Sequence, residues 1–208
     1  MMVSSMQKMS LRVRGLLDDR SGLAAVEFAM IFPIMVLMFF GVVELSAAIS
    51  ADRKATLVAR TLSDLTSQSV SVTDADLTNF GQAAKAIMTP YPPAPLTSSI
   101  TEVYVDKVSG VARVQWSKGL TIDTAGNVAI RTTTPRNPGD IVVLPPTLVA
   151  AKGTFVIWSE VSYKYTPAVG YLLAKTGLTF KDVAFTRPRL VLCVMYPAIG
   201  FSDCNTPV

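Results

Sequence analysis

The pattern of apolar and polar positions changes twice along the chain, and its first part predicts a membrane helix. Residues 28–43 carry no charged side chain and are flanked by Glu27 and Glu44. A bilayer core needs about 20 mostly apolar residues in helical form, and the Ala- and Val-rich shoulders extend the run to that length. We therefore expect a membrane-spanning helix over residues 23–51, which contains Pro33, a residue that membrane helices tolerate.

Two stretches of helical periodicity follow the apolar run. Apolar side chains recur at steps of three and four, which indicates that the first helix continues past the membrane, at Ala51, Ala55, Val58, Leu62 and Leu65. Thr73 and Asp76 have the spacing of a capping box, and a second stripe follows at Leu77, Phe80, Ala84 and Ile87. Four prolines within 90–95 predict that this second helix, in the region 52–89, ends in a stiff, extended linker over 90–99.

From residue 100 to residue 208 the pattern favours β structure. Alternating apolar and polar residues predict strands, the clearest of which starts at Thr154. A turn at 107–110 separates two further predicted strands, 100–105 and 111–116. The remaining predicted strands are 141–144, 183–185 and 190–196, and the strand that starts at Thr154 extends to residue 165. Residues 120–140 read as turns with one short strand, and 171–175 as a short helix. The predicted fold class is α+β: a long helix, a second helix and a small, mostly antiparallel β domain.

Composition excludes several classes of function. Of the 208 residues, 50% are hydrophobic and 16% charged, which argues against disorder, while the polar or alternating remainder argues against several membrane spans. The net charge of +4 is dispersed and forms no basic patch for nucleic acid. The chain has no His, so Ser-His-Asp and Cys-His catalysis are impossible. We expect no enzyme activity, no cofactor, no metal site, no nucleic-acid partner and no small-molecule substrate.

Two cysteines stand near the C-terminus, at Cys193 and Cys204. In an exported domain a disulfide is the default state of such a pair. A loop of this size stabilises the fold by about 3 kcal/mol on the chain-entropy estimate. We therefore predict a Cys193–Cys204 disulfide that closes a C-terminal loop.

Residues 1–22 have the character of a leader rather than of a secretory signal peptide. Four basic residues lie in this segment, and its apolar residues are scattered. A signal peptide places its apolar stretch before a small residue at the cleavage site, whereas here Gly22 precedes the apolar run. Residues 52–70 carry three basic residues. The positive-inside rule therefore favours a cytoplasmic N-terminus and an exported C-terminal part.

The string SGLAAVEF over residues 21–28 resembles the processing site of type IV prepilins and pseudopilins. The resemblance implies cleavage between Gly22 and Leu23 by a prepilin peptidase. Gly22 has no side chain, so a narrow protease cleft reaches its carbonyl. A carboxylate at Glu27 is costly near a membrane helix end. It would pair with the new amine of Leu23, one helical turn away or on a neighbouring subunit, and so set the stagger of packed subunits.

A closer resemblance is to the TadE/TadG-like family of the tight-adherence (Flp) pilus system. This resemblance rests on the Gly/Ala-rich start of the apolar segment, the string VEFA, a proline a few residues later and a second Glu near the end of the segment. The matching residues are Arg20, Gly22, Ala24, Ala25, Val26, Glu27, Phe28, Ala29, Pro33, Gly41, Glu44 and Leu45. Residues 156–190 resemble the family more loosely. The length leaves no room for a von Willebrand-type domain, so a short TadE- or TadF-like pseudopilin fits better than a full-length TadG.

The resemblance implies a structural role in the assembly of an adhesive pilus. The implied partners are the bacterial inner membrane, the prepilin peptidase and other Tad/Flp pilus subunits, with the C-terminal domain in the periplasm. The implied assembly residues are Glu27, Phe28, Pro33 and Glu44. Glu44 is also explained as an interfacial residue where the helix leaves the bilayer, and Pro33 as a tolerated kink.

Three other interpretations stay open. An uncleaved, membrane-anchored periplasmic module has the same hydropathy but keeps its leader. A type II secretion pseudopilin shares the processing site, although the globular half carries no feature that points to that system. An envelope enzyme that uses only Asp, Glu, Ser or Lys needs these groups to converge in a pocket, and the acidic residues are dispersed.

Overall fold

The computed structural model describes residues 22–131, 135–167, 177–197, 200, 204 and 207. Residues 1–21 of the expected leader and the expected short helix at 171–175 lie outside the described residues. The described chain divides into two compact units, which meet between Leu45 and Ser46. Helix α2 (Leu23–Ser67) is continuous through both of them, and the second unit holds all the other elements.

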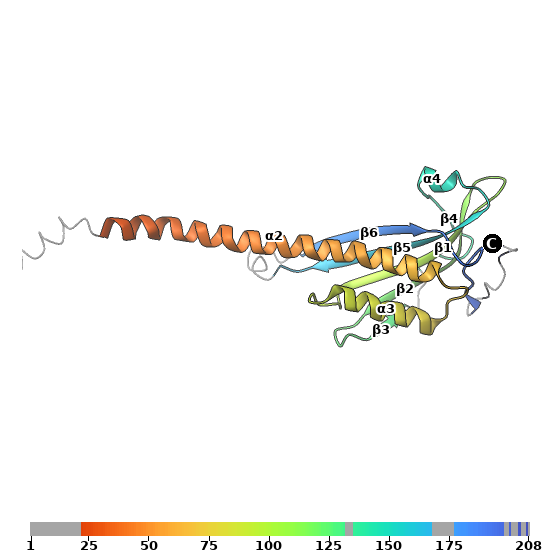
Figure 1. The fold of residues 1–208 in the computed structure, drawn as a ribbon, viewed down its shortest axis with the longest axis horizontal. Coiled ribbons are helices and arrows are strands. Elements are labelled where there is room, and N and C mark those ends of the chain that lie inside the picture. The colour runs from red at the N-terminus through yellow and green to blue at the C-terminus, as the bar shows by residue number, and fades with distance from the viewer. Residues whose placement is uncertain are drawn as a thin grey trace, which may run out of the picture. The chain divides into compact units, whose positions relative to one another are not determined.

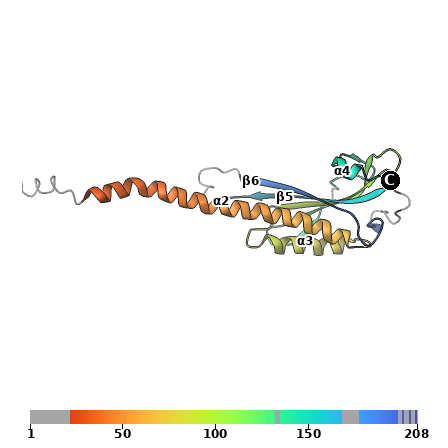
Figure 2. The ribbon, with the colours of Figure 1, turned by 45° about the horizontal axis from the view of Figure 1, so that its top comes forward.

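The second unit is an antiparallel sheet with helices on its two faces, which confirms the predicted α+β class (Figures 1 and 2). The sheet has six strands. Five of them are neighbours in the order β3-β2-β1-β5-β6, and the sixth, β4, pairs with β2 outside this order. Helices α2 and α3 (Asp74–Met88) cover one face. The short α4 (Pro146–Val149) packs on the other face. The strands are β1 (Leu96–Val105), β2 (Ala112–Ile122), β3 (Val128–Ile130), β4 (Ile141–Val142), β5 (Thr154–Tyr165) and β6 (Leu178–Thr186).

A stripe of small residues brings α2 onto the sheet. Ala51, Ala55 and Ala59 have no exposed surface, and Val58 and Leu62 are buried with them. Because alanine side chains are short, the helix backbone lies close enough for the Ser159 hydroxyl of β5 to donate a hydrogen bond to the carbonyl of Ala59. The predicted stripe is thus confirmed, except that its last member, Leu65, is only partly buried.

Helix α3 begins as the sequence predicts and packs beside β2 and β3. Thr73 and Asp76 form a reciprocal capping box, which satisfies amide groups of the first turn. Gly81 lets the helix approach β3, because a Cβ there would lie 2.4 Å from Val128. At the other end, the ammonium of Lys54 on α2 donates to the carbonyls of Ile87 and Thr89 at 2.7 and 2.8 Å, which caps α3 electrostatically.

The proline-rich stretch is a turn, not the extended linker that the sequence predicts. The Tyr91 amide donates to Met88 and the Leu96 amide to Pro93. The hydroxyl of Tyr91 reaches the carbonyl of Ala47 on α2, and that of Tyr163 reaches Pro92. These contacts fold the prolines against the core, so β1 starts at Leu96 rather than at residue 100.

The C-terminal segment is held to the sheet by a buried carboxyl group. Glu102 on β1 has no exposed surface. Its two oxygens accept hydrogen bonds from the Val194 amide at 2.7 Å and from the Trp116 indole at 2.8 Å. The indole also donates to the carbonyl of Val194. A register shift between Glu102 and Val103 in the β1–β2 pair lies beside this contact.

The expected strand over 190–196 does not form, because its backbone groups have other partners. The Val194 amide donates a hydrogen bond to the Glu102 carboxyl group. The Met195 amide donates to the carbonyl of Val70, and the Val72 amide donates to the carbonyl of Met195; Val70 and Val72 both lie in the connection between α2 and α3. Tyr196 donates to the Asp74 carboxylate and packs on Trp116. The described part of this segment is therefore held in place by these separate contacts rather than by a strand ladder. Its one sheet-like contact is an isolated parallel bridge between Ser71 and Met195.

We predict that Ala55→Leu destabilises the second unit by about 1–3 kcal/mol, because extra methylenes in a packed core force shifts of helix and sheet. The matched control is Leu57→Ala in the same helix, where the side chain is 51% exposed and the expected change is within about 0.5 kcal/mol. Thermal unfolding of the full chain in detergent micelles, followed by near-UV circular dichroism, measures both. Equal melting temperatures for the two variants would contradict the close packing of α2.

We predict that the stability of this unit falls as the pH rises from about 5 to 8. Burial raises the pKa of Glu102 from 4.5 to about 8, against the lowering effect of its two hydrogen-bond donors, the Val194 amide and the Trp116 indole. The folded state therefore holds one more proton than the unfolded state between these values. The contribution of protonated Glu102 to the free energy of unfolding is complete below the pKa that this group has in the unfolded chain. It decreases by about 1 kcal/mol per pH unit as the pH rises toward the pKa in the folded chain.

Glu102→Gln is the control for this pH dependence, since an amide does not titrate in the range. The slopes of melting temperature against pH are compared, not the melting temperatures themselves. The variant is expected to lose most of the slope. A variant with the full wild-type slope would show that another group causes it.

Candidate functional site: the apolar half of helix α2

Helix α2 begins directly after Gly22, the residue at which the sequence predicts cleavage. A Cβ atom on Gly22 would meet none of the described residues within 4 Å, and the φ angle of Gly22 is outside the left-handed region. In the part of the chain that the structure describes, neither space nor backbone conformation therefore requires glycine at this position. The bond between Gly22 and Leu23 lies at the boundary of regular helix, with exposed residues on both sides of it.

The first unit exposes an almost unbroken apolar surface. Between Leu23 and Leu45 the side chains are exposed, Met30 by 73% and Phe28 by 59%; only Val36 and Glu44 are partly covered. A helix that is apolar all round belongs in a protein core or in lipid, and this one has no core around it. In the described part of the chain, α2 is the one helix long and apolar enough to cross a membrane.

The structure brings the N-terminal site residues into the first turns of α2. Glu27 follows Leu23 by four residues, and side chains with that spacing are neighbours on one helix face. The Phe28 ring lies 5.4 Å from that of Phe32, which adds to the apolar surface. Pro33 lies inside the helix without interrupting it, although it removes one backbone donor.

Two carboxylates bracket the apolar surface. Glu27 and Glu44 are separated by about 25 Å along the helix axis at 1.5 Å per residue. A bilayer core is about 30 Å thick, so both groups fall near its boundaries when the helix spans it. Glu44 is only partly exposed.

The predicted disulfide is present in the second unit. Cys193 and Cys204 are bonded, with their Cα atoms 5.6 Å apart. The described residues contain no group of three His, Cys, Asp or Glu side chains placed to hold a metal ion.

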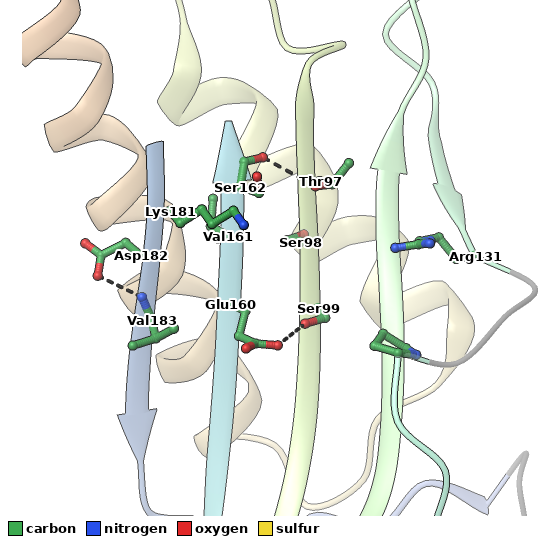
Figure 3. A pocket seen from close by; sticks show the side chains of 11 residues that line it. Thr97, Ser98, Ser99, Arg131, Glu160, Val161, Ser162, Lys181, Asp182 and Val183 are labelled. Carbon is green, nitrogen blue, oxygen red and sulfur yellow. Dashed lines mark hydrogen bonds between the residues drawn. The ribbon is translucent and has the colours of Figure 1, made fainter. Parts of the chain in front are cut away.

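Sequence reasoning did not single out two features of the second unit. The first is the buried contact of Glu102, whose signal is one acidic residue within the strand sequence LTSSITEVYV. The second is a polar cavity of about 300 Å³ on the sheet face opposite α2 and α3 (Figure 3). Its residues come from separate strands, so only the register reveals that they are neighbours.

The comparisons with known proteins agree with the N-terminal resemblance. A family model described as TadE-like protein matches residues 22–63. The match starts at Gly22 and contains Glu27, Phe28, Pro33 and Glu44, whereas the looser resemblance over 156–190 lies outside it. Neither the curated proteins nor the solved structures give a match. Residues 22–63, about a fifth of the chain, are therefore similar to the TadE-like protein family.

Proposed function

We propose that this chain is a minor pseudopilin of a tight-adherence (Flp) pilus. A prepilin peptidase cuts after Gly22 on the cytoplasmic side of the inner membrane. The mature helix, beginning at Leu23, stays in the membrane, and the sheet domain stands in the periplasm. The protein is a structural assembly component and the substrate of an enzyme rather than an enzyme itself.

One observation carries the proposal: the apolar helix and the family match both begin at the same residue pair. Gly22 lies just before the first helical residue, and none of the described residues fills the space beside it. A glycine that the fold does not need is explained by an external partner that reads it. A peptidase with a narrow cleft is such a partner.

Glu27 supports the same proposal through its position. Cleavage creates an α-amine on Leu23, and a carboxylate four residues on lies on the same helix face. Charges near the membrane boundary are costly unless they are paired. Pairing between Glu27 and the amine, within one helix or between neighbouring helices, therefore stabilises the mature form and its packing.

We predict that Gly22→Val abolishes removal of the leader, because a branched side chain at the cut bond obstructs the peptidase. Gly41→Val is the matched control: it is the same substitution inside helix α2, at a position where the described residues also leave nothing within 4 Å of the new Cβ. Intact-mass spectrometry of membrane fractions, from cells with and without prepilin peptidase, gives the N-terminus. We expect Leu23 as the first residue for wild type and Gly41→Val only where the peptidase is present.

Two results would contradict the processing step. A chain that keeps the leader in both strains would leave an uncleaved, membrane-anchored periplasmic module. A Gly22→Val chain that still starts at Leu23 would show that glycine is not what the peptidase reads.

We predict that Glu27→Gln is cut normally but supports surface attachment at least about fivefold less than wild type, because the amide keeps the shape but not the charge that pairs with the new amine. Asp52→Asn is the control: it removes one charge from an exposed position of the same helix outside the apolar surface. Counts of attached cells, together with the mature mass, separate assembly from processing. Wild-type attachment by Glu27→Gln would remove the proposed role of the carboxylate.

A further inference from the structure

The face of the sheet opposite α2 and α3 carries a row of small polar side chains. The strand register places Lys181, Ser162 and Thr97 side by side across β6, β5 and β1. The next row on the same face is Val183, Glu160, Ser99 and Gly119. Residues directly opposite each other in antiparallel strands share one face. The short hydroxyl side chains of Thr97, Ser99 and Ser162 thus form the floor of the polar cavity.

Two cations stand at opposite sides of this floor. Figure 3 shows Lys181 beside β5 and Arg131 beside β2, with Thr97, Ser98 and Ser99 between them. Within the described part of the chain, neither cation forms an ion pair. The Asp182 carboxylate, which Figure 3 shows on the outer side of β6, accepts from the Val183 amide instead.

The one acidic side chain that faces the cavity from β5 is already neutralised. Glu160 accepts two hydrogen bonds from Arg136, at 2.7 and 2.9 Å, in a bidentate pair. The Arg136 guanidinium also lies 3.8 Å from the centre of the Trp158 ring, which fixes its position. The positive charges of Arg131 and Lys181 therefore remain uncompensated beside hydroxyl groups.

Gly119 determines where Arg131 lies. A Cβ on Gly119 would stand 2.7 Å from Cδ of Arg131 and 3.3 Å from Cγ of Pro135. Glycine inside a strand weakens it and often marks a close approach. The absence of a side chain here lets the arginine stem lie flat across β2, so its guanidinium extends over the cavity floor.

We infer that this polar cavity binds a carboxylate side chain of an acidic polypeptide segment. Arginine donates in the planar fork that fits a carboxylate, lysine adds a second positive charge, and the hydroxyl of Ser162 supplies a short-range hydrogen bond. The Ser99 hydroxyl already donates to Glu160, at 3.1 Å. The inference is independent of cleavage at Gly22.

Binding is tested with the full chain in uncharged detergent micelles at about 150 mM salt, where long-range attraction is screened. The probe is a fluorescein-labelled peptide of alternating Glu and Ser, compared with one of alternating Gln and Ser, and anisotropy is the readout. Arg131→Gln with Lys181→Gln is expected to weaken binding of the Glu peptide at least about tenfold. The control pair, Arg187→Gln with Lys107→Gln, removes the same charge outside the cavity and is expected to change binding less than about twofold.

Gly119→Ala tests the geometry without any change of charge. The new methyl group displaces the stem of Arg131, so we expect the Glu peptide to bind about threefold to tenfold more weakly, with the melting temperature retained. Three results would overturn the inference: equal weakening by the two charge-matched pairs, equal binding of the Glu and Gln peptides, or unchanged binding by Gly119→Ala. Each would mean that the cations act only through net charge or not at all.

Discussion

One unbroken helix has to satisfy two different environments, and the rest of the structure depends on how its sequence does so. Up to Leu45, α2 exposes large apolar side chains in all directions, which lipid solvates and water does not. From Ala48 on, one side becomes a stripe of small residues buried against the sheet. Helix α2 thus contains both kinds of sequence within residues Leu23–Ser67.

In the second unit, buried hydrogen bonds attach the C-terminal segment to the sheet, and this segment completes the core. Glu102, Trp116 and Val194 form a closed set of buried hydrogen bonds, and the disulfide begins at the neighbouring Cys193. A buried carboxyl group is costly unless its oxygens have partners. These hydrogen bonds therefore fix the position of residues 193–196. They also explain why the alternating apolar residues of this segment do not form a strand.

Local patterns in the sequence predicted the elements whose causes are local. The alanine stripe of α2, the Thr73–Asp76 capping box and the alternation from Thr154 each arise from neighbouring residues, and all three appear in the structure. The failures are non-local. The prolines after α3 turn back because Tyr91 and Tyr163 find distant carbonyl groups. Residues 190–196 are taken by Glu102, whose role depends on a partner 92 positions away in the chain.

The same division between local and non-local causes separates the two candidate sites. Gly22, Leu23 and Glu27, the residues of the proposed processing site, lie within two helical turns of one another, so a family pattern over 22–63 contains all three. That pattern ends at Ser63, where α2 still packs on the sheet through the contact of Ser63 with Thr186. The polar cavity draws Arg131, Ser99, Ser162 and Lys181 from four places outside the pattern. The similarity to the family is therefore confined to residues 22–63, whereas the proposed recognition on the sheet face depends on residues and a register that the family pattern does not include.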